Sequence, residues 1–399
     1  MNVNAAHVIE RDLYVNNVIS GLKCEKDLLE YFTEARQLMS TAGMNLRSWI
    51  SKSACLRTAA EEKNVPNTCD VTKVLGLSWD PKLDTINFAE KQIPILEKVT
   101  KRTVLKFSSK IYGPLKLLSP VTVRTTILLQ EMWKLKYDWD TTLPSSIHAT
   151  WSEFPTDLNT VVRETSLSRQ LIQSVKGTGS DVKPEMHVFL DAINKLYGAA
   201  VYICNRNESR LVIAKSKITP VKTLSLPQLE SMAALIGTRL ATNIQSSLHM
   251  THITFRSDSQ IVLYWLSTTN TLTRFVANRV SEINTLTNTN TWKYFPTHDN
   301  PADLLTRGVS ASIFMKSSIL QTGTAWFTDT RRWPIWETEP LLVNTSLDEH
   351  AGTEKVPSHV LQTDIPTGSL LNLQSVINIS DYSSYRRLLR VTALVQRFV

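Results

Sequence analysis

Short apolar runs alternate with polar breaks between residues 187 and 215, and this pattern predicts three consecutive β-strands. The first run leads directly into Asp191, the second covers residues 198–203, and the third covers residues 210–215. Glycine or asparagine separates the runs, which is typical of an antiparallel meander. Each strand would therefore pair with the next one along the chain.

The spacing of apolar residues changes after Ser225 and predicts a helix. Ser225 and Gln228 form a capping-box pattern, and Pro227 is tolerated in a first helical turn. A buried stripe follows at helical spacing: Leu229, Met232, Ala233, Ile236 and Leu240. Glu230 lies beside this stripe, at the boundary between core and solvent.

Two further acids stand at the ends of predicted elements. Ile253 and Phe255 mark a fourth strand, and Asp258 follows it. Asp303 comes after Pro301, in the first turn of a short helix that ends near residue 308. Since ligand sites in α/β sheets gather at strand ends, we expect Asp258 and Asp303 to project toward one cleft with Asp191 and Glu230.

The order Asp191, Glu230, Asp258, Asp303 resembles the D-E-D-D set of ribonuclease H. Four separated words strengthen the resemblance: AKSKITPVKTLSLPQLESMAALIGTRL, SDSQIVLYWL, FVANRVSEI and PTHDNPADLLTRG. They are similar to the ribonuclease H segment of Pol polyproteins from BEL/Pao-type LTR retrotransposons. The resemblance implies an α/β fold over residues 184–310, with a five-stranded mixed sheet flanked by helices.

The same resemblance implies a phosphodiesterase site with two Mg²⁺ ions, or Mn²⁺. Two divalent ions about 3.5–4 Å apart stabilise both the attacking and the leaving oxygen of an in-line displacement. Asp191 would bridge the ions with help from Asp258, Glu230 would hold the ion near the attacking water, and Asp303 would complete the other. Spacing alone is equally compatible with unrelated surface acids. The surrounding words favour the metal site.

One departure from the ribonuclease H pattern concerns a histidine. Many members place a histidine before the last acid to help the product leave, but residues 292–295 read WKYF here. His298 is closer to Asp303 and either takes that role or is a solvated turn residue. We favour the second interpretation.

Residues 1–92 resemble the end of a reverse-transcriptase palm. RDLYVNNVISG predicts a strand–turn–strand, residues 26–41 a helix that Gly43 ends, residues 45–51 a strand, and residues 73–88 two strands across a turn at Pro81. The hairpin resembles the polymerase YxDD hairpin, but Asn16 and Asn17 stand where that family has an aspartate pair. An amide is a poorer Mg²⁺ ligand than a carboxylate, so we expect no polymerase activity.

Residues 93–180 resemble a thumb and connection region, with an amphipathic helix predicted over residues 122–136. A basic row runs through it: Lys98, Lys101, Arg102, Lys106 and Lys110. Trp133, Trp139 and Trp151 are either core residues or, with these cations, a nucleic-acid-binding surface. We favour core positions for the tryptophans and leave both alternatives open for the basic row.

In the family that this sequence resembles, the middle region is often labelled a Pao retrotransposon peptidase. The residues of this sequence do not support that label. An aspartic peptidase needs an Asp-Thr-Gly or Asp-Ser-Gly turn, because two aspartates must share one proton. Neither tripeptide occurs in the sequence.

Residues 175–185 and 340–375 are polar and predict linkers, whereas residues 322–340 are rich in Trp and Pro and are expected to lie over a domain surface. Residues 380–399 form a basic amphipathic pattern that resembles the helix before an integrase zinc-binding module, a feature of DNA integration. A membrane-surface helix is the weaker alternative. We assign residues 311–399 to linker and lead-in helix, without zinc ligands.

Composition agrees with a nucleic-acid partner. The net charge is +8, and apolar residues make up 42% of 399 residues, so ordinary globular cores are possible. Without a long apolar run or signal pattern we expect no membrane association or secretion, and a location in the cytoplasm, a virus-like particle or the nucleus. Four scattered cysteines indicate reduced thiols.

Two hypotheses remain for function. The first is a Mg²⁺-dependent nuclease that cuts RNA in RNA–DNA hybrids, working beside the rest of a Pol polyprotein. The second is a degenerate element remnant that binds nucleic acid without catalysis, which Asn16 and Asn17 favour. In both, the expected nucleic-acid-binding residues are Lys215, Lys217, Lys222, Arg274 and Arg279.

Overall fold

The computed structural model describes residues 4–333, apart from 15–16, 23, 68, 70, 75, 89–91, 111–112, 114, 173–183, 206–207, 288–290 and 325. The predicted linker at 340–375 and the predicted helix at 380–399 lie outside these residues, as do Asn16 and most of the linker predicted at 175–185.

A five-stranded mixed sheet forms the largest part of the fold. Its strands are β7 (Glu185–Ala192), β8 (Leu196–Cys204), β9 (Ser209–Ile218), β10 (Ile253–Ser257) and β11 (Trp292–Tyr294). They lie in the order β11-β10-β7-β8-β9. The hairpins β7–β8 and β8–β9 are antiparallel, as the meander pattern predicts, whereas β10 runs parallel to both β7 and β11. The predicted mixed sheet is confirmed.

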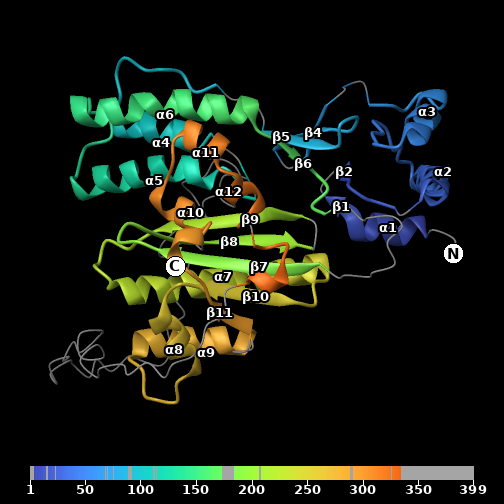
Figure 1. Cartoon of the computed structure of the whole chain (residues 1–399). Helices are drawn as coiled ribbons and strands as arrows, with labels where there is room; N and C mark the ends of the chain where they lie inside the picture. The colour runs from blue at the N-terminus through green and yellow to red at the C-terminus, as the bar shows by residue number, and fades with distance from the viewer. Residues whose placement is uncertain are drawn as a thin grey trace, which may run out of the picture. The chain divides into compact units, whose positions relative to one another are not determined.

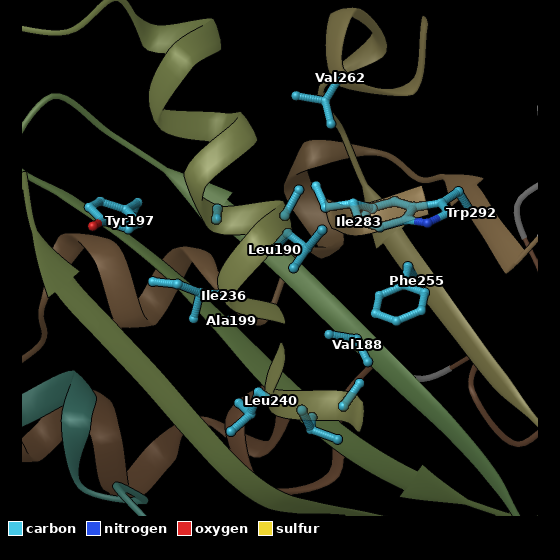
Figure 2. Packing of buried hydrophobic residues seen from close by; sticks show 14 of the residues in the cluster. Val188, Leu190, Tyr197, Ala199, Ile236, Leu240, Phe255, Val262, Ile283 and Trp292 are labelled. Carbon is cyan, nitrogen blue, oxygen red and sulfur yellow. The ribbon is translucent and has the colours of Figure 1, made fainter. Parts of the chain in front are cut away.

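Helices cover one face of this sheet. Helix α7 (Leu226–Leu248) lies directly on β7 and β8, and α8 (Gln260–Ser267) and α9 (Arg274–Leu286) pack beside it (Figure 1). Leu190, Ala199, Ile236 and Leu240 meet in the shared core (Figure 2). At Gly237 a Cβ atom would lie 2.2 Å from Leu190 Cδ2, so only glycine lets helix and sheet approach this closely.

The second face is covered by the segment that follows the sheet. The segment contains η2 (Thr297–Asp299), α10 (Asp303–Arg307), α11 (Ala311–Lys316), α12 (Ser318–Thr322) and η3 (Thr330–Arg332). Trp326 and Phe327 are buried against Phe189 and Tyr202 of the sheet. The sequence predicts that residues 322–340 lie over a domain surface. In the described part of this segment, up to residue 333, Trp326 and Phe327 pack on the sheet as buried core residues.

The N-terminal region contains small elements. They are α1 (Ala5–Asp12), β1 (Leu13–Tyr14), β2 (Asn17–Val18), α2 (Glu25–Thr41), α3 (Ala54–Glu62), β3 (Thr72–Val74), β4 (Leu77–Asp80) and β5 (Thr85–Phe88). The hairpin β1–β2, helix α2 and the pair β4–β5 agree with the sequence. The strand predicted over residues 45–51 is wrong, because this stretch makes only one bridge, from Trp49 to Pro66.

The middle region contains α4 (Lys101–Ser108), α5 (Ser119–Lys134), α6 (Ser145–Glu164) and β6 (Ser166–Ser168). Strand β6 pairs with β5 and so returns to the N-terminal sheet. Helix α5 lies along β9, where Gln130 Nε2 donates to Thr219 O at 2.6 Å. The helices α5, α6 and α11 share one apolar core with Trp151.

The prediction that all three tryptophans are core residues is right for Trp151 and wrong for the other two. Trp133 is 47% exposed and Trp139 is 40% exposed. The inward face of α5 is already filled by Leu128, Leu129 and Met132, so Trp133 projects outward.

All four cysteines are free thiols in this structure: Cys24, Cys55 and Cys69 are exposed, and Cys204 is buried. Within the described ranges, we find no helix whose length and apolar character would let it cross a bilayer.

The layer formed by residues 311–333 gives the first prediction. Phe327→Ala should lower the free energy of unfolding by about 3–5 kcal/mol, because a large buried ring is lost from contact with Phe189, Tyr202 and Trp326. Ile313→Ala in the same layer is the control, since that side chain is 53% exposed and should change stability by less than about 0.5 kcal/mol. Denaturant unfolding measures both, and equal values would show that this layer is not part of the core.

Candidate active site

Asp191 lies near the end of β7 and points to the same face as Phe189, because side chains alternate along a strand. It is buried, and two groups from the loop and helix after β11 hold it. The Thr306 hydroxyl donates to Asp191 Oδ2, and Asn300 Nδ2 donates to Leu190 O at 2.8 Å and lies 3.5 Å from Asp191 Oδ1. Asp191 is thus fixed in direction before any ligand binds.

Glu230 reaches the same place from the first turns of α7. The predicted capping box is present: Gln228 N donates to Ser225 Oγ at 3.4 Å, and Ser225 N donates to Gln228 Oε1 at 3.0 Å. This cap sets where the helix begins and hence where Glu230 stands. Glu230 Oε2 is buried and has no hydrogen-bond partner.

Asp258 follows the last residue of β10, as the sequence predicts. A hydrogen bond from the Thr297 side chain orients its carboxyl group. One carboxylate oxygen each from Asp191, Glu230 and Asp258 lies within 4.8 Å of the other two. Three acids from three different elements therefore converge at one end of the sheet.

Burial dominates the electrostatics of this cluster. It raises the pKa of Asp191 to about 7, against the opposing hydrogen bond from Thr306. It raises the pKa of Glu230 to about 9, where the charges of Asp191 and Asp258 add to the effect. The pKa of Asp258 is raised too, again mainly by burial.

These three side chains are suited to a divalent cation. All donors are carboxylate oxygens, which Mg²⁺ and Mn²⁺ prefer. The Oε2 of Glu230 is buried without a hydrogen-bond partner, so this oxygen is available as a ligand. A bound cation would both satisfy this oxygen and offset the repulsion.

Asp303 occupies a different position from the other three acids. It is the first residue of α10, as predicted, but its carboxylate accepts a hydrogen bond from Arg307 Nε at 2.5 Å. Its charge still helps to raise the pKa values of Asp191 and Asp258. The structure brings together three of the four predicted acids and places Asp303 beside them, paired with Arg307.

His298 lies in η2, and its side chain is 78% exposed, with Nε2 3.5 Å from Asp299 Oδ2. An exposed imidazole beside a surface carboxylate agrees with a solvated turn histidine.

The predicted nucleic-acid-binding residues fall into two groups. Lys215 and Lys217 on β9, Lys222 and Arg274 are exposed. Arg279 instead contacts Phe275 in its own helix. Its guanidinium lies 3.4 Å from the centroid of the Phe275 ring, and its Nη1 donates to Phe275 O at 2.6 Å. The binding role of all five residues stays a prediction.

Sequence reasoning missed Thr306 and Asn300. Both lie within PTHDNPADLLTRG, in which the sequence analysis singled out only His298 and Asp303. The sequence could have indicated them by two features: Thr306 carries a hydroxyl one helical turn after Asp303, and Asn300 stands in the loop just before Asp303. Both are buried here, where a polar side chain needs a hydrogen-bond partner.

The family comparison matches the middle of the chain. Residues 100–259 match the model of the Pao retrotransposon-like RNaseH-like domain. This match supports an RNase H-like region of retrotransposon type, and it spans α4–α6 as well as the sheet as far as Asp258. The comparison with curated proteins gave no match.

Solved structures give distant similarities. The foamy viral protease-reverse transcriptase in complex with RNA/DNA hybrid is 12% identical, over 70% of this chain and 39% of that chain, with a TM-score of 0.41. RNase H1 from the halophilic archaeon Halobacterium salinarum NRC-1 is 13% identical, over 35% of this chain and 94% of that chain, with a TM-score of 0.21. The present chain thus spans about two fifths of the foamy viral chain.

The raised pKa values predict how stability depends on pH when no divalent ion is bound. The folded state keeps protons on Asp191 and Glu230 up to their pKa values of about 7 and about 9, whereas the unfolded chain loses them near the ordinary carboxyl range. Stability should therefore fall as the pH rises from about 4.5 toward 9.

Glu230→Gln tests this dependence, because it keeps the shape and removes the ionisable group. In EDTA at pH 8 the variant should be more stable than the wild type by at least about 1.4 kcal/mol, the equivalent of one pKa unit, and the gain should shrink at pH 5. Thermal unfolding across this pH range measures the difference. Glu61→Gln at an exposed position on α3 is the matched control. The same gain in stability in this variant would show that the gain does not come from burial of Glu230.

Proposed function

We propose that this chain carries the RNase H-type nuclease of a BEL/Pao-type Pol protein and hydrolyses RNA in RNA–DNA hybrids. The observation that carries the proposal is the convergence of Asp191, Glu230 and Asp258, with one oxygen of each within 4.8 Å of the others. Three desolvated carboxylates cost stability unless something binds between them. A divalent cation is the ligand that this donor set fits.

Asp191, Glu230 and Asp258 would hold Mg²⁺, or Mn²⁺, which supplies charge stabilisation for both oxygens of an in-line displacement and lowers the pKa of bound water. The chain's own residues prepare the site. Thr306 and Asn300 fix the carboxyl group of Asp191, and Thr297 orients that of Asp258. Glu230, with a pKa of about 9, keeps a proton at neutral pH that a cation would displace.

Asp303 is our proposed fourth ligand, for a second ion. In the present arrangement Arg307 holds its carboxylate, so Asp303 would have to exchange this partner for the cation. The two residues are four apart on one short helix, and the Arg307 side chain is 66% exposed, so this ion pair contributes little. The exchange is therefore energetically accessible.

For the N-terminal region we propose reverse-transcriptase ancestry without polymerase activity. Asn17 lies in β2, where the resemblance would require a carboxylate. This substitution is the observation that favours the alternative function, a remnant that binds nucleic acid without cutting it. The intact acidic cluster favours the nuclease.

Asp258→Asn distinguishes the two functions. The variant keeps its shape but loses a charge and a metal ligand, so cleavage of a labelled RNA–DNA hybrid with Mg²⁺ should fall by more than about 100-fold, beyond what loss of an outer partner of a ligand costs. Glu61→Gln should cleave as the wild type does. Equal cleavage by the wild type and Asp258→Asn would indicate a contaminating nuclease. Salt-sensitive binding without cleavage by any form would support the remnant.

The polymerase proposal has its own test. Primer extension on a primed RNA template should not exceed a no-protein control, and Asn17→Asp alone should not restore it, since one carboxylate does not rebuild a two-ion site. Extension by the wild-type chain would contradict the proposal.

A further inference from the structure

Two exposed tryptophans stand side by side outside the acidic site. The rings of Trp133 and Trp139 meet edge to face, with centroids 5.4 Å apart. Lys101 lies between them, only 5% exposed, with Nζ 4.1 Å from the Trp133 centroid and 4.9 Å from that of Trp139. We call these three side chains the indole platform. Single exposed apolar residues are ordinary, but a paired indole surface is typical of a binding site.

The platform is held rigidly. Lys101 Nζ donates to Tyr137 O at 3.2 Å, and Arg102 N donates to Trp139 O at 3.0 Å. The Arg102 side chain also donates two hydrogen bonds to the Asp140 carboxylate, from Nε at 2.7 Å and from Nη2 at 2.9 Å. The loop that carries Trp139 is therefore tied to the start of α4, and little conformational entropy remains to be lost when a ligand binds.

Charge around the platform favours an anionic ligand. Residues 97–106 and 133–140 contain six lysine and arginine side chains against three carboxylates. One of these carboxylates, Asp140, is already bonded to Arg102. Lys98, Lys106, Lys134 and Lys136 are exposed. Exposed π-faces combined with surrounding cations are the elements of a surface that binds single-stranded nucleic acid.

One hydrogen bond connects the helix that carries Trp133 with the turn after β7. This turn begins two residues after Asp191, and Lys195 in it donates to Glu131 Oε1 at 2.8 Å. Glu131 stands two residues before Trp133 on α5. The turn after the first catalytic acid is thus bonded to the helix end that carries the platform.

We propose that the indole platform binds an unpaired segment of the nucleic acid on which the acidic cluster acts. Bases stack on the outer faces of Trp133 and Trp139, and the exposed lysines contact phosphates. Lys101 is a positioning residue, because its ammonium group is already enclosed by the two rings and Tyr137 O. The proposal rests on the proposed function in naming the substrate, while binding at the platform needs no cleavage.

Fluorescence anisotropy tests the platform in EDTA, where cleavage is absent. The probes are labelled oligothymidylate, a blunt RNA–DNA hybrid and the same hybrid with a single-stranded extension. Trp133→Ala and Trp139→Ala should each weaken oligothymidylate binding at least about fivefold, the lower range for loss of one base–aromatic stack. Trp133→Phe keeps a π-face and should retain most of the affinity. Affinity for the blunt hybrid should be nearly unchanged, and the advantage of the extension should disappear in the alanine variants.

Leu83→Ala is the matched control, an apolar side chain that is 73% exposed in the β4–β5 turn. Circular dichroism and thermal unfolding confirm that each variant is folded. The proposal is overturned if the wild type does not bind oligothymidylate, or if the folded alanine variants bind it as tightly as the wild type. It is equally overturned if their only change is a lower tendency to self-associate, which would make the platform a contact between copies of this chain.

Failure of the nuclease gives a different pattern. Loss of hybrid cleavage in every form, with tryptophan-dependent oligothymidylate binding intact, contradicts the proposed function and leaves the platform standing. If hybrid cleavage depends on Asp258 but oligothymidylate binding does not depend on the two tryptophans, the platform proposal is contradicted and the proposed function is not.

Discussion

Asp191, Glu230 and Asp258 repel one another, and much of the surrounding structure opposes that repulsion. Burial raises the pKa values of all three, and the charges of neighbouring carboxylates, Asp303 among them, add to the effect. Hydrogen bonds work in the other direction: Thr306 donates to Asp191, the Ala192 backbone to Glu230, and Thr297 to Asp258. These donors lie at the end of β7, in η2 and in α10. The three acids therefore come together only where these segments pack against each other.

The position of α10, which brings Thr306, depends in turn on the middle region. Helix α10 ends at Gly308, whose φ of +74° and close approach to Arg124 and Val123 disfavour any side chain there. The next amide, Val309 N, donates to Pro120 O at 2.8 Å, at the start of α5. The helices of residues 93–180 therefore support the acidic cluster although they precede the sheet in sequence. The predicted boundary near residue 184 therefore marks a change in sequence pattern only. Elements on its two sides, such as α5 and α10, pack against each other.

The sheet and α7 were predictable because their residues carry strong local periodicity, and three of the four acids follow from where those elements end. The errors concern information that no local pattern contains. Residues 45–51 make a single parallel bridge, in which Trp49 N donates to Val65 O and Asn67 N donates to Trp49 O, and the φ of +58° at Ser48 interrupts the extended backbone just before it. Trp133 is exposed because neighbours on α5 fill the inward face. Asp303 is not among these errors: it pairs with Arg307 four residues later on α10, and its role as a ligand stays a prediction.

Strand β10, which delivers Asp258, also carries a guanidinium into the core. Arg256 is buried between Trp326 and Trp333, with its Cζ 4.8 Å from each ring centroid, and its Nε donates to His187 Nδ1 at 3.1 Å. Burial lowers the pKa of His187 to about 4, which keeps the imidazole neutral and able to accept this bond. Within the described residues no carboxylate is hydrogen-bonded to Arg256, so aromatic faces supply most of the compensation. Residues 326–333 thus stabilise the strand that positions Asp258, which couples the outer layer of the fold to the acidic cluster.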